Sequence, residues 1–403
     1  MKRIYLDHAA TTPVDPAVFR AMKPFFCERF ANPSSFHTAG LEVQREVIAA
    51  RKNIASMINA HEDEIIFCSG GTESDNLAIQ GIVRAHADHG NHVITSSIEH
   101  PAVLETLQRL HKRGEIELTI LDVDEFGLID VKNVVKALTK KTILVSVMTA
   151  NNEIGTIEPI ADIGRAILQY RKEHETAYPL FHTDACQAAG AMDLDVTKSH
   201  VDLLTINGGK IYGPKGIGLL YVKRGIKITP MIIGGGQEKG LRSGTENVPG
   251  IIGFAKALEL VSKRMEKENA RLSALRDHLI AGLLKIPKTR LNGHATKRLP
   301  NNVNISFMDI EGEAAVLYLD AKGICTSTGS ACASTTLDPS HVILALGVSY
   351  EAAHGSLRFS LGKDTTKEDI EYVIRIMPDI VKKLRHMSPV NLDMRYFESA
   401  TKK

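Results

Sequence analysis

Lys210 has an unusual setting for a lysine. It follows an apolar, β-branched stretch (201–206) and the glycines Gly208 and Gly209, and a second apolar stretch (217–222) comes after it. This pattern predicts two strands joined by a turn that carries the lysine. Burial lowers the pKa of an ammonium group, which suits an amine that forms a Schiff base. An exposed lysine at the tip of a hairpin is the alternative.

Two other features could act together with this lysine. Asp184 ends a predicted strand over 179–183, and the turn SGGT (69–72) lies between a short predicted strand and a predicted helix. A strand, a glycine turn and a helix present free backbone N–H groups to a phosphate. A lysine, a strand-end aspartate and a phosphate turn are the parts that pyridoxal phosphate needs, since the carboxylate keeps its pyridine nitrogen protonated.

Predicted strands and helices alternate from residue 65 to residue 184. This alternation predicts an α/β fold with a mostly parallel central sheet that helices cover on both faces. Such sheets bind ligands at the carboxyl ends of their strands. One edge of the sheet could therefore collect the polar residues that follow predicted strands: Gly71, Thr72, His100, Asn152, Asp184 and Lys210.

The pattern changes towards the C-terminus. A long helix is predicted from residue 247 to about 284, and a smaller α+β region follows Pro300. A chain of 403 residues is too long for one core. We therefore predict a large α/β domain over 15–260 and a small α+β domain made of 1–14 and 261–403.

Composition excludes several classes of partner. Lys and Arg number 49 against 47 Asp and Glu, so neither nucleic acid nor a membrane surface is expected as a partner. The sequence has no apolar run long enough to span a bilayer and no secretory h-region. Five cysteines are few and odd in number, which favours a reducing compartment. A cytoplasmic protein is expected, and no metal site is predicted.

Each candidate residue also has a structural interpretation. Asp184 could cap a helix, and His100, just before Pro101, could be a hydrogen-bonded core histidine. Asn152 could serve only its own turn, and Arg358 could be half of a structural ion pair. Combined in one site, they gain a common chemical purpose.

A series of motifs, in order along nearly the whole chain, resembles those of cysteine desulfurases of the NifS/IscS type, in the class V aminotransferase family. The motifs are YLDHAATTP, SGGTESDN, EHPAV, NNEIG, HTDACQAAG (182–190), KIYGPKGIG (210–218), RSGTEN (242–247), STGSACAS (327–334) and LRFSLG (357–362). The resemblance implies the fold-type I pyridoxal phosphate fold, like that of aspartate aminotransferase. It also implies a homodimer with two cofactor sites.

The resemblance implies a role for each residue around the cofactor. Lys210 would carry pyridoxal phosphate, and Asp184 would pair with its pyridine nitrogen. Gln187 would hydrogen-bond the ring oxygen, and His100 would stack on the ring. Lys210 and His100 would also be catalytic.

The phosphate site includes one departure from the family. Gly71 and Thr72 would hold the phosphate, with Thr245 reaching in from the partner subunit. The family usually has His directly before the lysine and Ser two places earlier, where this chain has Gly209 and Asn207. Asn207 can still donate a hydrogen bond, but Gly209 offers only backbone, so a weaker hold on the phosphate is expected.

The remaining roles concern the substrate and its sulfur. Asn152 and Arg358 would bind the substrate carboxylate, a planar anion that suits a guanidinium group. Cys332 would take the sulfur as a persulfide, from a loop of small residues, 327–336, that can reach the cofactor and then an acceptor. Cys325 follows an apolar pair and is expected to be structural.

The predicted function is therefore a cysteine desulfurase. It would convert L-cysteine to L-alanine and transfer the sulfur to an acceptor protein, for iron–sulfur cluster assembly or other sulfur transfer. A selenocysteine lyase, or another lyase or aminotransferase on the same scaffold, is a second interpretation. A sulfur-transfer scaffold without catalysis is a third. The sequence leaves open the acceptor and whether Cys332 can also ligate a cluster.

Overall fold

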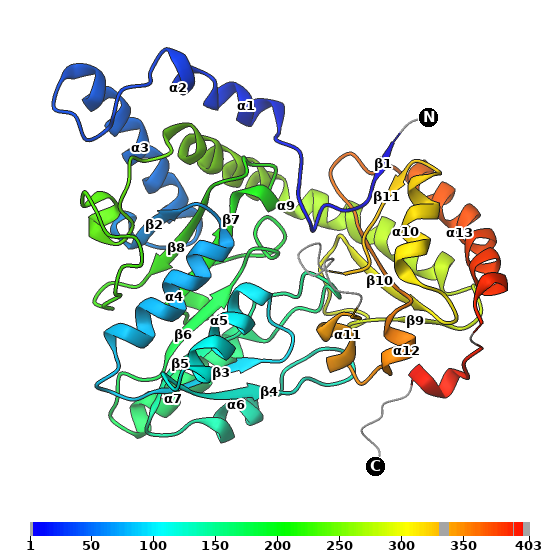
Figure 1. The fold of residues 1–403 in the computed structure, drawn as a ribbon. Helices are drawn as coiled ribbons and strands as arrows, with labels where there is room; N and C mark the ends of the chain where they lie inside the picture. The colour runs from blue at the N-terminus through cyan, green and yellow to red at the C-terminus, as the bar shows by residue number, and fades with distance from the viewer. Residues whose placement is uncertain (1–2, 330–337, 390, 398–403) are drawn as a thin grey trace.

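The computed structural model describes residues 3–329, 338–389 and 391–397, and within them a seven-stranded sheet forms the centre of the fold (Figure 1). Its strands, in spatial order, are β2 (Ile65–Cys68), β8 (Gly218–Val222), β7 (Leu203–Asn207), β6 (Leu180–Asp184), β5 (Thr142–Ser146), β3 (His92–Ser96) and β4 (Glu117–Leu121). From β7 to β4 all neighbours are parallel, whereas β8 is antiparallel to β7 and to β2. The predicted α/β fold with a mostly parallel sheet is confirmed.

Helices cover both faces of this sheet. Leu203 and Leu204 are adjacent on β7 but belong to different core clusters, because successive side chains of a strand point to opposite faces. One face packs against α3 (Thr38–Met57), α6 (Val131–Ala137), α7 (Ile160–Glu173) and the first half of α9 (Val248–Leu283). The other packs against α4 (Gly71–Ala85) and α5 (Pro101–Lys112). Burial on both faces explains why these strands read as continuous apolar runs.

A second core forms around a smaller sheet. Its strands are β9 (Thr289–Leu291), β10 (Asn302–Phe307) and β12 (Ser356–Ser360), all antiparallel, and β1 (Ile4–Tyr5) pairs in parallel with β11 (Ile324–Cys325) nearby. The helices α10 (Gly312–Asp320) and α13 (Lys367–Met387) pack on this sheet. Ile4 and Leu6 belong to this core, so the first residues of the chain lie with its last third.

The remaining helical segments are short. They are α1 (Pro16–Met22), α2 (Pro24–Cys27), α8 (Val196–Ser199), α11 (His341–Ala345), α12 (Tyr350–Ala353), η1 (Glu62–Glu64), η2 (Gly208–Lys210), η3 (Gln237–Gly240) and η5 (Met394–Phe397). Among the residues described, none of the helices is both long and apolar enough to cross a lipid bilayer.

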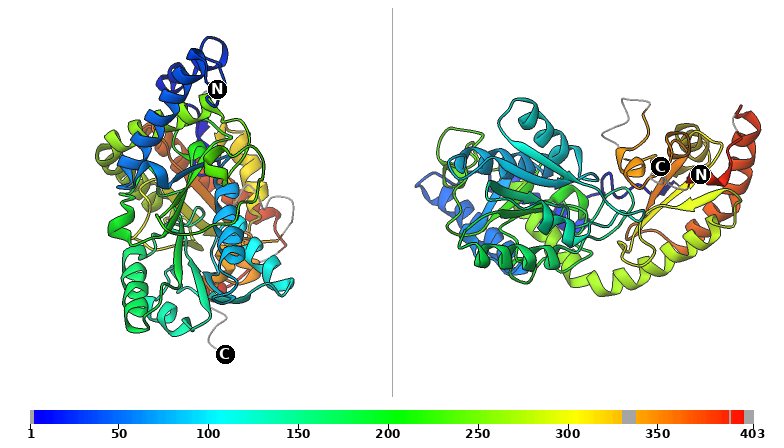
Figure 2. Two further views of the ribbon diagram at one scale, coloured as in Figure 1. Left: turned by 90° about the vertical axis from the view of Figure 1, so that its left-hand side faces the viewer. Right: turned by 90° about the horizontal axis from the view of Figure 1, so that it is seen from below.

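Helix α9 joins the two cores. The Asn247 side chain caps it by accepting the N–H of Gly250. Phe254 packs in the first core and Leu279 in the second, and Figure 2 (right) shows the helix passing from one body to the other. The domain boundaries given above, after residues 14 and 260, remain a prediction.

Glu158, near the start of α7, makes stability depend on pH. Its side chain is buried, one oxygen accepts the N–H of Ile129, and burial raises its pKa from 4.5 to about 8. Between these values the folded protein holds a proton that the unfolded chain has lost, so unfolding free energy falls by about 1.4 kcal/mol per pH unit. Glu158→Gln should remove that contribution, which urea unfolding at several pH values would measure. An unchanged slope would contradict it.

Candidate active site

Lys210 reaches the carboxyl edge of the sheet because β7 ends in a tight turn. The Asn207 side chain accepts the N–H of Gly209 at 3.0 Å, which starts η2. Gly208 must be a glycine, since a Cβ there would lie 2.8 Å from the Ile217 side chain. Lys210 Nζ donates to the carbonyl oxygens of residues 9 and 10 at 2.8 and 2.5 Å. The predicted arrangement of two strands around the lysine is observed.

The residues predicted from the sequence meet in one cavity of about 170 Å³. Its lining includes Gly71, Thr72, His100, Asn152, Asp184, Gln187, Asn207, Lys210 and Arg358. Thr245 is not part of this lining and is exposed in the same chain. Cys332 lies outside the described residues. The carboxyl edge of the sheet therefore collects the polar groups, as expected for a parallel sheet.

One end of the cavity is built for an anion. Helix α4 begins at Gly71 directly after β2, and no side chain of the described residues caps its first turn. The backbone N–H groups there and the positive end of the helix dipole favour a phosphate. The Asn207 amide nitrogen lies 3.6 Å from the position that a Cβ on Gly71 would take. Asn207 thus lies where a phosphate donor is needed, whereas Gly209 does not line the cavity.

Two buried carboxyl groups also line the cavity. Asp184 Oδ1 accepts the N–H of Cys186 at 2.8 Å. Asp75, one helical turn after Gly71, is 1% exposed, and its Oδ1 has no hydrogen-bond partner within the described part of the chain. Burial, and then the Asp184 carboxylate, raise the pKa of Asp75. Asp184, the neighbouring carboxylate, is therefore the group suited to a ligand that presents an N–H, as a protonated pyridine ring does.

His182 provides no positive charge for these two carboxyl groups. The ring is completely buried, and burial lowers its pKa to about 4, so it is neutral near pH 7. Its two nitrogens hydrogen-bond the hydroxyl groups of Ser146 and Thr205 at 2.9 and 3.1 Å. His182 therefore does not neutralise the Asp184 carboxylate.

His100 has both a structural position and a place in the cavity wall. Its Nδ1 accepts the N–H of Ala102 at 3.1 Å and so caps α5. In the neutral ring the proton is then on Nε2. His100 is thus a hydrogen-bonded structural histidine through Nδ1, and its ring also lines the cavity.

The Arg358 guanidinium is held by two groups. The side chain is 1% exposed, donates to Asp7 Oδ1 at 2.8 Å and to the Asn152 carbonyl oxygen at 3.2 Å. Its Nε has no partner within residues 3–329, 338–389 and 391–397. The ion-pair interpretation is thus correct for part of the guanidinium, and the remaining donor is available to a carboxylate in the cavity.

Sequence reasoning missed some of the lining. Asp75 and Cys186 line the cavity, and Asp7 pairs with Arg358. The backbone carbonyls of residues 9 and 10 accept from Lys210. Each of these residues lies inside one of the sequence motifs quoted above. Asp75 is four positions after Gly71, and residues four apart lie on the same face of a helix, so this spacing could have indicated the buried carboxyl group.

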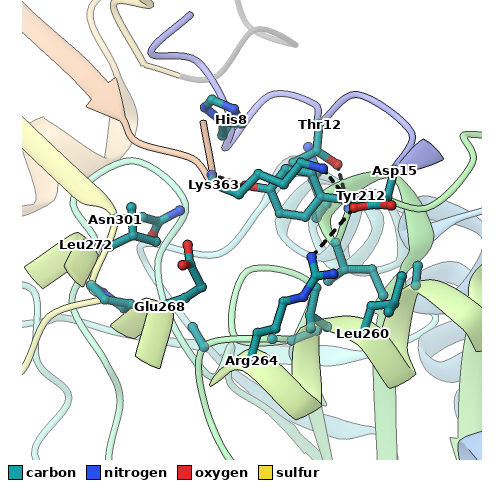
Figure 3. A pocket seen from close by; sticks show the side chains of 18 of the residues that line it. His8, Thr12, Asp15, Tyr212, Leu260, Arg264, Glu268, Leu272, Asn301 and Lys363 are labelled. Atoms are coloured by element: carbon teal, nitrogen blue, oxygen red, sulfur yellow. Dashed lines mark hydrogen bonds and ion pairs between the residues drawn. The ribbon is translucent and has the colours of Figure 1, made fainter. Parts of the chain in front are cut away.

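A larger cavity of about 520 Å³, drawn in Figure 3, also has Lys210 and Gln187 in its lining. Three of the charged side chains that line it pair with one another: Asp15 accepts from Lys363 at 2.7 Å and lies 3.8 Å from Arg264. Asp184, Asn152 and Arg358 line the smaller cavity and not this one, so we place the chemistry in the smaller cavity.

The fold and this cavity are those of a class-V aminotransferase: the family model described as "Aminotransferase class-V" matches residues 4–373, and the chain belongs to that family. It is 52% identical to "Cysteine desulfurase IscS" of Methanosarcina thermophila over 389 residues, which cover 96% of this chain and 94% of the relative. It is 51% identical to the protein of that name from Clostridium botulinum, over 96% and 97% of the two chains.

Solved structures give the same result. One described as a "NIFS-LIKE PROTEIN" superimposes with a TM-score of 0.88 at 35% identity, covering 95% of this chain and all of that one. Another, "SspA in complex with cysteine", has a TM-score of 0.77 at 35% identity, with 89% and 98% covered. The resemblance to the NifS/IscS type, the pyridoxal phosphate fold type I and the dependence on this cofactor are confirmed.

Gly71 is a point where one added carbon should disturb the cofactor site. A Cβ there would lie 2.8 Å from Cys186 Sγ. Gly71→Ala should therefore displace the phosphate turn, at about 1–3 kcal/mol as for other overpacked sites, and weaken retention of pyridoxal phosphate. Dialysis followed by visible absorbance measures that retention.

Cys186, whose sulfur the added carbon would meet, provides the control for this change. Removing the sulfur in Gly71→Ala/Cys186→Ala should restore cofactor retention, while Cys186→Ala alone should retain cofactor like the unmodified protein. The steric explanation is wrong if the double variant is no better than Gly71→Ala.

Proposed function

We propose that this protein is a pyridoxal phosphate-dependent cysteine desulfurase. It transfers the sulfur of L-cysteine to the Cys332 thiol, so that L-cysteine and the thiol become L-alanine and a persulfide. The observation that carries the proposal is a single cavity with a lysine amine, a strand-end aspartate, a phosphate-type turn and a buried guanidinium. The relatives of the same name, about half identical over nearly the whole chain, support it.

In this proposal the residues that line the cavity hold the cofactor. Lys210 would bind the aldehyde carbon, Asp184 the ring nitrogen and Gln187 the ring oxygen, and His100 would cover the ring. Gly71, Thr72 and Asn207 would hold the phosphate. When bound, the cofactor withdraws electrons from the substrate and so makes the C–S bond cleavable. Asp184 supports this by keeping the ring nitrogen protonated.

The substrate carboxylate binds to Arg358 and Asn152. The unpartnered Nε of Arg358 is a charge-assisted donor in a buried setting, where an ionic hydrogen bond is strong. The carboxylate in turn completes the hydrogen bonding of the guanidinium.

Cys332 is the thiol that takes the sulfur. A thiolate is the reactive form, and burial disfavours it at other cysteines. Burial raises the pKa of Cys68 to about 12 and also raises the pKa values of Cys186 and Cys325. Those three thiols are therefore protonated near pH 7.

Cys332→Ser separates substrate binding from sulfur transfer. The variant should keep its cofactor and still change its visible spectrum with cysteine, because Lys210, Asp184 and Arg358 are intact. It should release essentially no alanine, since a hydroxyl is a much weaker nucleophile than a thiol. Alanine release and the mass of the protein measure this.

Cys325→Ser is the matched control and should remain active with a sulfur adduct on Cys332. Alanine release at the wild-type rate from Cys332→Ser, or loss of activity only in Cys325→Ser, would refute the assignment.

The active form is a homodimer in this proposal. Thr245 is exposed and lies outside the cavity of its own chain, which fits a residue that completes the partner's phosphate site. Large apolar side chains are also exposed on the surface of this chain: Phe30 at 75%, Phe36 at 95% and Ile233 at 85%. An ion pair between Arg51 of α3 and Glu238 of η3 joins the helix that follows Phe36 to the segment that follows Ile233. Exposed apolar area of this kind marks an interface.

Charges placed in this surface should separate the subunits. Phe36→Asp combined with Ile233→Asp should give a monomer by sedimentation and weaken cofactor retention, because burying an unpaired carboxylate in an interface is unfavourable. The control is Phe126→Asp, which should stay dimeric. Phe126 is 44% exposed and lies in the loop between β4 and α6. A fully active monomer would contradict the proposal.

The sulfur acceptor in this proposal is a protein of iron–sulfur cluster assembly or of another sulfur-transfer route in the cytoplasm. The four cysteines within the described residues are free thiols, which fits a reducing compartment. Such a compartment also releases sulfur readily from a persulfide.

A further inference from the structure

Glu153 lies beside the substrate site but does not line its cavity. It lies in the turn after β5, directly after Asn152, and is only 2% exposed. Its backbone N–H donates to Asn151 Oδ1 at 2.8 Å. A buried carboxylate that binds neither cofactor nor substrate needs another reason to be there.

The Glu153 carboxylate hydrogen-bonds one end of the stretch that contains Cys332 and lies close to the other end. The Ser340 hydroxyl donates to Glu153 Oε2 at 2.5 Å. On the other side, a Cβ on Gly329 would lie 2.9 Å from the same oxygen and 3.7 Å from the Ser340 Cβ. Gly329 and Ser340 therefore meet at this carboxylate. Residues 330–337, which include Cys332, lie between them in sequence and outside the described residues.

Each end is also tied to an element of the substrate site. The Ser340 hydroxyl accepts the N–H groups of Val342 and Ile343 and so starts α11. Before Gly329, Ser327 exchanges backbone hydrogen bonds with Arg358 at 2.7 and 3.2 Å. The chain before Gly329 is thus fixed to Arg358, and Ser340 is fixed to Glu153, which directly follows Asn152.

The position of Glu153 is itself set by the small sheet. Its carbonyl oxygen accepts the side-chain amides of Asn302 and Asn304, both at 3.1 Å. These two asparagines lie on β10, beside the strand that carries Arg358. The carboxylate therefore has a fixed place relative to the groups that would hold the substrate.

We propose that Glu153 is a positioning residue for sulfur transfer: by holding Ser340 beside Asn152, where Gly329 also passes, its carboxylate sets where the thiol of Cys332 can reach. This inference rests on the proposed function. It assigns Glu153 to the sulfur-transfer step and to neither cofactor binding nor substrate binding. A hydrogen bond between a hydroxyl and a buried carboxylate is strong enough for this purpose.

The test separates binding of cysteine from the first turnover in the holoenzyme. The variants are Glu153→Gln, Ser340→Ala and their combination, with Ser340→Thr as a variant that keeps the hydroxyl. Cysteine titrated against the visible spectrum gives its affinity, and rapid quenching gives the rate of alanine formation in the first turnover. Glu158→Gln is the matched control, since Glu158 is a buried glutamate of the same segment that contacts neither Gly329 nor Ser340.

Ser340→Ala and Glu153→Gln should slow the first turnover by about tenfold or more, as misplacement of a reacting group does. Cysteine affinity should stay within about twofold, because Arg358 and Asn152 are unchanged. The double variant should be no slower than the slower single variant, since Glu153→Gln weakens the same hydrogen bond that Ser340→Ala removes. Ser340→Thr and Glu158→Gln should keep the wild-type rate.

Equal losses of affinity and rate would show a general distortion of the site and overturn the inference. So would first-turnover rates in Glu153→Gln and Ser340→Ala that match Glu158→Gln. If the unmodified protein forms no alanine from cysteine, the proposed function itself fails. An active wild-type protein with unaffected Glu153 and Ser340 variants refutes the positioning role alone.

Discussion

The buried guanidinium of Arg358 is the interaction on which the relation between the two cores depends. At 1% exposure its charge must be compensated inside the protein. Asp7 supplies the opposite charge from the N-terminal segment, and the Asn152 carbonyl supplies an acceptor from the large sheet. A residue of β12 thereby fixes the start of the chain and a turn of the large sheet in one place, which is where a substrate carboxylate would bind.

A second constraint is the concentration of acidic groups at the carboxyl edge of the sheet. Asp75, Asp184 and Glu99 lie within the same buried region, and burial raises the pKa of Glu99 to about 8. Because His182 is neutral there, these groups provide no cation of their own. The region is therefore electrostatically suited to a ligand that brings a positive ring nitrogen, and less suited to one that brings another anion at that end.

Small residues allow the site to close around such a ligand. Gly71 lets the phosphate turn approach Cys186, Gly208 lets the turn before Lys210 pass Ile217, and Gly329 lets the chain pass the Glu153 carboxylate. At each point a Cβ would come within 3 Å of its neighbour. At each of these places the absence of a side chain lets segments that are distant in sequence pack closely.

The sequence by itself determined the local parts of this protein. Periodicity and turn residues predicted the parallel sheet, the turn that carries Lys210 and the helix that starts at Gly71, because such features depend on neighbours a few residues away. Only the tertiary structure decided the contacts between distant segments. Asp7 and Arg358 are 351 positions apart, and Glu153 and Ser340 are 187 apart, so no spacing reveals either pair. Burial strengthens the interactions within these pairs, and which residues are buried depends on how the whole chain packs.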